Sequence, residues 1–374
     1  YNDIILKQVL HNVDTIWTLP QLLWIKNNEP QIWAKVGKIM FAKDFVRHKF
    51  TGDYVTDNIE AEGSMLFDYN RQCWSEELCG ILSLDTRALP KIVSPSDVAG
   101  TVSADAAADT GLCEGTTVLC GTTDTVMEVF AAGAVSEGQM TLKLATAGRI
   151  CVVTSKSYPD KNLINYSHVI DGLWYPGTAT KSCAASYRWY RDTFGGDYAE
   201  LDRGAESIAP GADGLVFSPY LNGELTPYAD PKLCASFIGV RSSHTKAHFT
   251  RAVLEGVSMS ILDCKNELEK IGIPHEDSAA IIGGGGKSPL WRQITSDILG
   301  IKLVEKKYAD SSFGSAMFAG VAAGFWKTPK DALNVCNETV SETMPDAKNH
   351  ALYKKVFERY KKVHDALAPI YNED

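Results

Sequence analysis

The stretch Cys120-Gly121-Thr122-Thr123-Asp124-Thr125-Val126-Met127-Glu128 decides how the rest of the chain is interpreted. The short apolar run 117–120 precedes it, and apolar residues from Val126 to Ala134 follow at roughly helical spacing. This order predicts a strand, a tight turn and then a helix. Open α/β folds bind ligands at the carboxyl edge of the sheet, so the turn would place Asp124 at such an edge.

Two interpretations of Asp124 follow from this stretch. The positive end of the helix dipole would keep the carboxylate ionised, which suits a general base or a metal ligand. The alternative is an N-cap aspartate that only starts the helix. The stretch by itself favours the cap, and the other motifs of the chain reverse that preference.

Composition and charge exclude several classes of protein. The 374 residues allow roughly two domains, and 45% hydrophobic with 22% charged residues is ordinary for a globular protein. A net charge of −9 argues against nucleic acid or an anionic membrane as the main partner. The nine cysteines are scattered and contain no CxxC pair, so we expect a reduced, cytoplasmic protein without a zinc site or a disulfide framework. No run is apolar enough to span a bilayer, and no signal peptide is recognisable.

The chain opens at Tyr1 without a methionine, and residues 4–10 already follow a helical pattern. We therefore expect an N-terminal portion to precede this sequence. Periodicity and turn residues predict an α/β architecture with a domain boundary near 135–139. The predicted helices span 17–38 (with a break at Pro30), 43–49, 57–64, 74–82, 104–110, 181–194, 246–271, 288–299, 313–325 and 351–370. The later predicted strands span 140–144, 149–154, 163–170, 173–176, 215–220, 279–282 and 302–304.

A turn of four glycines, Gly283-Gly284-Gly285-Gly286, follows the predicted strand 279–282 and precedes the predicted helix from Ser288. Glycines there let a ligand approach the backbone, and the helix N-terminus offers free N–H groups to a nucleotide. A dinucleotide fingerprint fails at its third glycine, and a Walker loop lacks its GxxxxG frame. A tight turn without a ligand remains the alternative.

The segment Leu142-Lys143-Leu144-Ala145-Thr146-Ala147-Gly148 predicts a hairpin of small residues just after the boundary. Such hairpins can present N–H groups and a hydroxyl to phosphate, although most are only turns.

Several separated motifs together resemble the FGGY family of carbohydrate kinases. Ala235-Ser236-Phe237-Ile238-Gly239-Val240 and, seven residues later, His248 to Gly256 resemble its second signature, and Thr18 to Asn28 resembles its first, with Gln21 where lysine is usual. Further motifs in family order are Lys43-Asp44, Thr51-Gly52, Leu66-Phe67-Asp68, Pro219 to Glu224, the four-glycine turn with Trp291, and Gly314-Ser315-Ala316. The resemblance covers nearly the whole chain, and the motifs look most like those of xylulokinase-like members.

The resemblance implies two actin-like, ribonuclease-H-like lobes, with residues 1–136 in the sugar-binding lobe and 137–374 in the nucleotide-binding lobe. It implies ATP and Mg²⁺ as cofactors and a small sugar or polyol as the partner, and a homodimer is compatible with it. Asp124 then matches the catalytic base, with Asp124 and Thr125 at the substrate and Asp124 also near the metal. The residues expected at the nucleotide are Thr146, Gly148, Gly283, Gly284, Gly285, Gly286 and Ser288.

Departures from the family pattern keep other functions open. Thr125 stands where xylulokinases usually have Asn, so ribulose, glycerol or gluconate are alternatives to a ketopentose such as xylulose. The hairpin has Ala145-Thr146-Ala147 in place of Gly-Thr-Ser, and Leu225 replaces a usual arginine. The family's N-terminal phosphate loop is not found in these residues, so we expect this stretch by itself to be a poor kinase. A non-catalytic actin-like nucleotide-binding scaffold is the rival from another class.

Overall fold

The computed structural model describes residues 2–10 and 12–373, and these form two compact units. The first unit contains the chain up to Ala131 together with Ser155–Tyr175 and Asp310–Cys336. The second unit contains Ala132–Thr154, Pro176–Ala309 and the chain from Asn337 onward. The chain therefore passes between the units near the predicted boundary, and two later segments return to the first unit. Whether the family lobes divide at residue 136 stays a prediction.

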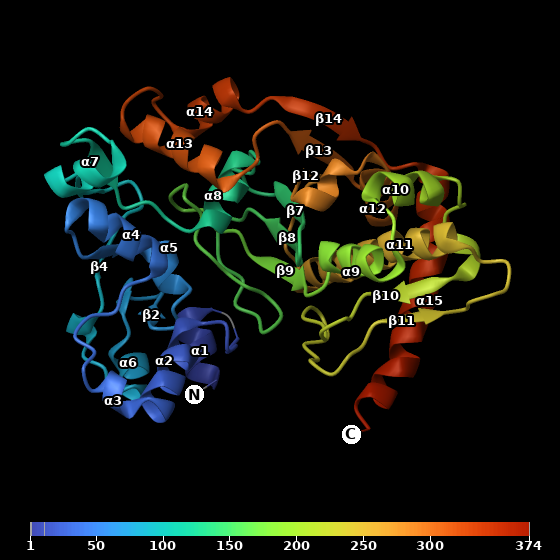
Figure 1. Cartoon of the computed structure of the whole chain (residues 1–374), viewed down its shortest axis with the longest axis horizontal. Helices are drawn as coiled ribbons and strands as arrows, with labels where there is room; N and C mark the ends of the chain where they lie inside the picture. The colour runs from blue at the N-terminus through green and yellow to red at the C-terminus, as the bar shows by residue number, and fades with distance from the viewer. Residues whose placement is uncertain (1, 11, 374) are drawn as a thin grey trace. The chain divides into compact units, whose positions relative to one another are not determined.

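The first unit is mostly helical, with strands in short pairs (Figure 1). Its helices are α1 (Asn2–Val9), α2 (Thr18–Asn28), α3 (Pro30–Trp33), α4 (Ala42–Thr51), α5 (Asn58–Glu62), α6 (Glu76–Ile81), α7 (Ala104–Thr110), α8 (Asp124–Ala131), α13 (Ser311–Ala322) and α14 (Pro329–Cys336). The strands pair as β1 (Val55–Asp57) with β4 (Lys91–Val93), β2 (Phe67–Asp68) with β3 (Cys73–Trp74), and β5 (Val98–Thr101) with β6 (Thr117–Leu119). Of these pairs, β1 and β4 run parallel and the other two antiparallel.

The apolar face of α6 anchors one core of this unit. Leu78 and Cys79 are fully buried there, and Met65 and Leu66 pack in the same cluster. Residues of α1 and α2 close it, including Ile5 and Leu19. Burial of this apolar surface stabilises a region that has little sheet of its own.

The second unit is built on a six-stranded sheet with the order β14-β13-β12-β7-β8-β9. Its strands are β7 (Met140–Leu144), β8 (Gly148–Val152), β9 (Gly177–Thr180), β12 (Ser278–Ile282), β13 (Lys302–Lys306) and β14 (Thr339–Thr343), with β10 (Val216–Ser218) and β11 (Ser236–Ile238) as a separate pair. Its helices are α9 (Ala184–Phe194), α10 (Tyr198–Glu206), α11 (Lys246–Ile271), α12 (Pro289–Leu299) and α15 (Ala347–Tyr371). The central strands β7, β12 and β13 are parallel, and β8, β9 and β14 add antiparallel edges.

Helix α11 forms the centre of the second unit and packs against β8, β9 and β10 (Figure 1). Its residues Leu254, Val257, Ile261 and Leu268 recur every three to seven positions and are fully buried. Gly256 permits the close approach to β10, because a Cβ there would lie 2.2 Å from the carbonyl oxygen of Phe217. The helix has the predicted bounds, as do β7 and α7.

The strands predicted at 163–170 and 173–176 form only a short pairing around a turn at Gly172, whose φ is +76°. Ser167 and Trp174 make an isolated bridge, and two backbone hydrogen bonds, of 2.8 and 2.9 Å, join the flanks beside it. The hydroxyl and N–H of Ser167 also donate to the buried carboxyl group of Glu62.

Candidate functional site

The turn that carries Asp124 lies in the first unit, between β6 and α8. The hydroxyl of Thr123 accepts from the N–H of Val126 at 3.5 Å, and its carbonyl oxygen accepts from the N–H of Met127 at 3.3 Å. Thr123 therefore lies at the capping position, and Asp124 is the first residue of the helix. The interpretation of Asp124 as only an N-cap is not supported by this geometry.

The carboxylate of Asp124 is exposed, and its Oδ1 accepts from the Thr125 hydroxyl at 3.3 Å. Its position in the first turn of α8 places it at the positive end of the helix dipole. An exposed carboxylate with remaining acceptor capacity can take a proton from a substrate hydroxyl or ligate a cation.

Close packing holds α8 in place. A Cβ at Gly314 of α13 would lie 2.3 Å from the carbonyl oxygen of Met127 and 3.3 Å from the Cβ of Ala131. Only glycine permits this contact, which accounts for the Gly314-Ser315-Ala316 motif. Val126 and Phe130 of the same helix are fully buried, so packing holds the helix that carries Asp124 in place.

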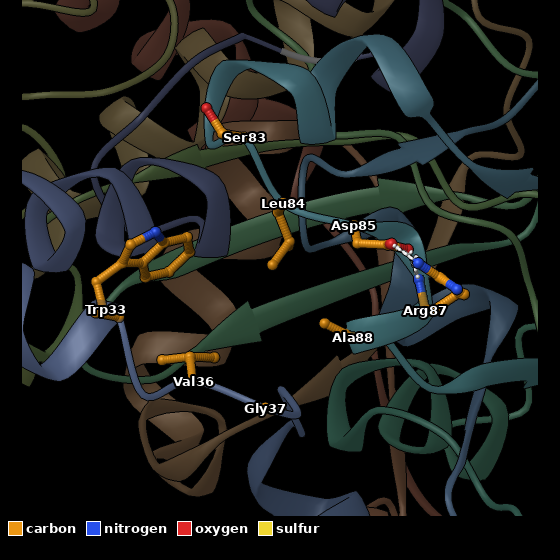
Figure 2. A pocket seen from close by; sticks show the side chains of 9 residues that line it. Trp33, Val36, Gly37, Ser83, Leu84, Asp85, Arg87 and Ala88 are labelled. Carbon is orange, nitrogen blue, oxygen red and sulfur yellow. Dashed lines mark hydrogen bonds and ion pairs between the residues drawn. The ribbon is translucent and has the colours of Figure 1, made fainter.

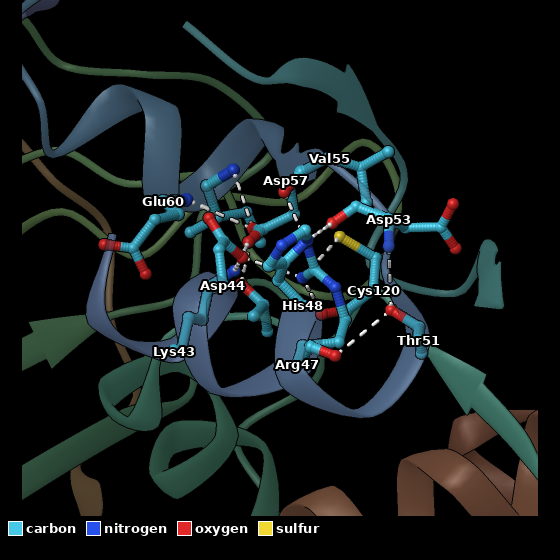
Figure 3. Close-up of polar contacts among 12 residues, drawn as sticks. Lys43, Asp44, Arg47, His48, Thr51, Asp53, Val55, Asp57, Glu60 and Cys120 are labelled. Carbon is cyan, nitrogen blue, oxygen red and sulfur yellow. Dashed lines mark hydrogen bonds and ion pairs between the residues drawn. The ribbon is translucent and has the colours of Figure 1, made fainter. Parts of the chain in front are cut away.

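A cluster of charged side chains, shown in Figure 3, is connected to the turn through Cys120. Lys43 forms ion pairs with Asp44 at 2.6 Å and with Asp57 at 2.7 Å, and both carboxylates are fully buried. The guanidinium of Arg47 pairs with Asp44 at 2.7 Å and donates to the carbonyl oxygen of Cys120 at 2.8 Å. Sequence reasoning did not assign Arg47 or Asp57 a role, because their link to the turn spans more than sixty residues.

Glu60 follows this cluster on α5. Burial raises the pKa of its carboxyl to about 7, and the charges of Asp57, Asp44 and Asp124 act in the same direction, while Lys43 opposes them. Glu60 is therefore a second titratable acid in the electrostatic field of Asp124.

The four-glycine turn lies in the second unit, between β12 and α12. Gly283 has φ +87° and ψ 166°, a conformation that glycine alone adopts readily. A Cβ at Gly283 would lie 2.7 Å from the carbonyl oxygen of Leu144, and one at Gly285 would lie 2.7 Å from the ring of Trp291. Gly284 differs, because it is exposed and no atom lies within 4 Å of the position of a Cβ.

The structure brings the predicted phosphate hairpin and the glycine turn together. Strands β7 and β12 are parallel neighbours with Lys143 opposite Ile282, so residues 145–147 and Gly283 follow at the same edge of the sheet. A Cβ at Gly283 would also lie 3.1 Å from the N atom of Ala145. Thr146 is exposed at this edge, and its carbonyl oxygen accepts from the N–H of Cys183 at 3.0 Å.

Gly148 and Ser288 have supporting contacts within the protein. A Cβ at Gly148 would lie 2.6 Å from Cδ1 of Ile261, so this glycine permits the packing of α11 on β8. The Ser288 hydroxyl accepts from the N–H of Trp291 at 3.1 Å, which caps α12, and donates to Asp202 at 2.7 Å. These contacts stabilise the turn, and whether either residue also contacts a nucleotide stays a prediction.

The first unit contains cavities away from the Asp124 turn. One, of about 540 Å³, is lined by Trp33, Val36, Leu84, Asp85 and Arg87 among others, and Figure 2 shows the Arg87–Asp85 ion pair at its edge. Another, of about 360 Å³, is lined in part by Asn58, Ser94 and His168. None of the predicted site residues lines either cavity.

In the part of the chain that the structure describes, no group of three or more His, Cys, Asp or Glu side chains is arranged to hold a metal ion. Among the described helices, none is long and apolar enough to cross a membrane.

The chain matches both domains of one protein family. The N-terminal domain of the FGGY family of carbohydrate kinases matches residues 1–131, and its C-terminal domain matches residues 117–323. The chain belongs to the FGGY family of carbohydrate kinases. As an FGGY kinase it is an enzyme that phosphorylates a carbohydrate with ATP as the phosphate donor.

Individual relatives agree with this assignment. The chain is 30% identical over 366 residues to the xylulose kinase of Lactococcus lactis, which covers 96% of this chain and 72% of the relative. It is 27% identical over 372 residues to a gluconokinase of Bacillus licheniformis, covering 95% and 72%. The crystal structure of xylulose kinase from Rhodospirillum rubrum superposes with a TM-score of 0.89 at 26% identity, over 100% of this chain and 76% of that chain. The predicted fold of two actin-like lobes is thereby confirmed.

Proposed function

We propose that this FGGY kinase transfers the γ-phosphoryl group of ATP to a hydroxyl of a ketopentose, with xylulose as the leading acceptor. The observation that carries the catalytic part is the carboxylate of Asp124, exposed on a rigid turn at the start of α8. The choice of xylulose is supported by relatives such as the xylulose kinases of Lactococcus lactis and Rhodospirillum rubrum.

Asp124 would act as the general base. Phosphoryl transfer depends mainly on positioning and charge neutralisation, and a single carboxylate that accepts the proton of the attacking hydroxyl is sufficient. The carboxylate lies at the positive end of the α8 dipole, and Thr125 beside it would offer a hydroxyl to the sugar. Proton transfer to Asp124 would make the acceptor oxygen a better nucleophile as the bond to phosphorus forms.

The edge formed by the hairpin and the glycine turn would hold the nucleotide. Gly284 leaves its backbone open to a ligand, and Thr146 presents an exposed hydroxyl close to the same edge. Backbone N–H groups in such a turn, together with a helix N-terminus, attract phosphate or the polar groups of a nucleoside. We also propose that the sugar-binding lobe ends at residue 136 and the nucleotide-binding lobe begins at residue 137.

Mg²⁺ would be bound together with ATP. This ion usually keeps several waters and is held by one or two carboxylates plus substrate phosphates, so a dedicated protein cage is not needed. Asp124 fits the part of the single carboxylate, because it is exposed and has acceptor capacity left. The ion would neutralise charge that develops on the transferring phosphoryl group.

Alternative acceptors have specific support, whereas a non-catalytic scaffold does not. The similarity to a gluconokinase and the Thr125 position favour testing gluconate, ribulose and glycerol as acceptors. A scaffold that binds ATP without turnover would leave the exposed carboxylate of Asp124 unexplained.

The nine unbridged cysteines support a cytoplasmic setting for the kinase. Light scattering would test whether it forms a homodimer.

The experiment compares Asp124→Asn with the control Asp105→Asn in the full-length protein. Asp105 is also an exposed acid in the first turn of a helix of the first unit. Loss of a general base usually lowers kcat about 10² to 10⁴-fold, and we expect this loss in Asp124→Asn with unchanged Tm and ATP affinity. The control should keep full activity. Near-normal kcat in Asp124→Asn would refute the proposal, and release of ADP with xylulose, ribulose, glycerol or gluconate would identify the acceptor.

A further inference from the structure

The residues just before Asp124 are tied to buried charges rather than only to their neighbours in sequence. The Thr122 hydroxyl donates to Oδ1 of Asp57 at 2.7 Å, across a separation of 65 residues. The same Oδ1 accepts from the N–H groups of Ile59 at 3.0 Å and Glu60 at 3.1 Å, and Oδ2 pairs with Lys43 at 2.7 Å. Three contacts besides the one with Thr122, from Ile59, Glu60 and Lys43, therefore fix the Asp57 carboxylate.

A second contact holds the other end of the turn. Arg47 donates to the carbonyl oxygen of Cys120 and also to that of Val55, on the strand that ends at Asp57. The cluster comprises two cations, Lys43 and Arg47, and two anions, Asp44 and Asp57; the Lys43 side chain is 24% exposed and the other three are buried. Removing one member would leave another charge unpaired, which is costly in a buried site.

We propose that Thr122 and Asp57 are positioning residues for the phosphoryl transfer reaction: their hydrogen bond sets the direction in which Asp124 presents its carboxylate. This inference rests on the proposed role of Asp124 as the base. Thr123 caps α8 and thereby defines the helix axis, but the cap alone leaves the approach from Cys120 to Thr122 undetermined. Its first two residues are held by backbone hydrogen bonds, from the N–H of Cys120 to Asp97 at 2.8 Å and from the N–H of Gly121 to Pro95 at 3.0 Å, and by the Arg47–Cys120 contact. The Thr122–Asp57 hydrogen bond holds its last residue, two positions before Asp124.

The rate should be sensitive to this contact because a base works only in a narrow range of geometry. A displacement of about 1 Å at a reacting group can cost about 10²-fold in rate. A hydrogen bond from a hydroxyl to a carboxylate is of the stronger, charge-assisted type. Its loss would free the turn to move and would also lower the stability of the fold slightly.

The experiment uses Thr122→Val, which keeps the shape and removes the donor, and Thr122→Ser, which restores it. Thr116→Val is the matched control. The Thr116 hydroxyl donates to the carbonyl oxygen of Cys113 at 2.7 Å, just before the N-terminal end of β6, whereas Thr122 follows its C-terminal end. We expect kcat of Thr122→Val to fall about 10- to 100-fold with ATP affinity unchanged, Thr122→Ser to recover most of it, and the control to match the parent. A kcat of Thr122→Val within twofold of the parent would overturn the proposal.

A second measurement separates positioning from simple destabilisation and from failure of the proposed function. If Thr122 acts through Asp124, adding Thr122→Val to Asp124→Asn should cause little further loss, because the base is already gone. Fully multiplicative losses would overturn the positioning role while leaving Asp124 as the base. High activity in Asp124→Asn would instead refute the proposed function. If Thr122→Val folds poorly, Thr122→Ala takes its place in both measurements.

Discussion

Gly283→Ala and Gly284→Ala together test whether the four-glycine turn serves structure, nucleotide binding or both. The residues are adjacent, and the substitution adds the same methyl group to each. Their surroundings differ sharply, because the Cβ at Gly283 would meet the backbone of Leu144 and the Cβ at Gly284 would meet nothing within 4 Å.

The cost at Gly283 has two parts. A residue other than glycine in its backbone region costs about 1 to 3 kcal/mol. The added carbon would lie 2.7 Å from the carbonyl oxygen of Leu144 and 2.8 Å from its carbon, so strand β7 or the turn must shift. Overpacking of this kind costs about 1 to 3 kcal/mol more, and a total of about 2 to 6 kcal/mol is a large part of the stability of a typical domain.

We therefore expect Gly283→Ala to lower the Tm by at least about 4 °C and to weaken ATP binding as the turn distorts. Gly284→Ala should leave the Tm within the range of ordinary surface substitutions, about 0.5 kcal/mol. If ATP approaches the open backbone at Gly284, the new methyl group occupies its space, and the affinity should fall about tenfold, which corresponds to about 1.4 kcal/mol.

Calorimetric titration with ATP and thermal unfolding of both variants provide the two readouts. Weakened binding with a normal Tm in Gly284→Ala would support a nucleotide site. Normal ATP affinity in Gly284→Ala, with only Gly283→Ala destabilised, would show that the turn is structural and that the nucleotide reasoning is wrong.

Two further predictions concern buried polar groups. Burial raises the pKa of Glu62 to about 8 from its usual value of 4.5, so the folded state retains a proton that the unfolded state releases. The free energy of unfolding should therefore fall as pH rises from about 4.5 to about 8, by at most about 1.4 kcal/mol per pH unit from this group. Glu62→Gln should make the Tm less dependent on pH between pH 5 and 8, and a pH dependence equal to that of the parent would contradict this assignment. The buried hydroxyl of Tyr353 donates to Glu255 and accepts from Arg251, each at 2.7 Å, so Tyr353→Phe should cost about 1 to 3 kcal/mol in urea unfolding. No change in the urea midpoint would show that this network contributes little.

Much of the local structure could be predicted from the sequence because its causes are local. Helix α11 has apolar residues at helical spacing and Gly272 at its end with φ +84°, and the structure has it over Lys246–Ile271. Strand β7 and the glycine turn after β12 were likewise readable, since strand pattern and glycine both act within a few residues. The separate family motifs then indicated the FGGY fold before any tertiary contact was known.

Other elements were missed for an equally physical reason. Strand β9, Gly177–Thr180, consists of one glycine, one alanine and two threonines, so it shows no apolar alternation. It can pair with β8 because Gly177 has no Cβ, which would lie 2.6 Å from the sulfur of Cys151. Helix α14 and strand β14 were also not predicted.

By itself the sequence determined which residues could do chemistry: the acid at the start of α8 and the glycines after β12. Tertiary structure alone decided that Thr122 and Cys120 are held by Asp57 and Arg47. Hydrogen bonds and ion pairs between residues more than sixty positions apart depend on how the chain is packed, and no local pattern specifies them. For the same reason, the return of Ser155–Tyr175 and Asp310–Cys336 to the first unit could be learned only from the folded chain.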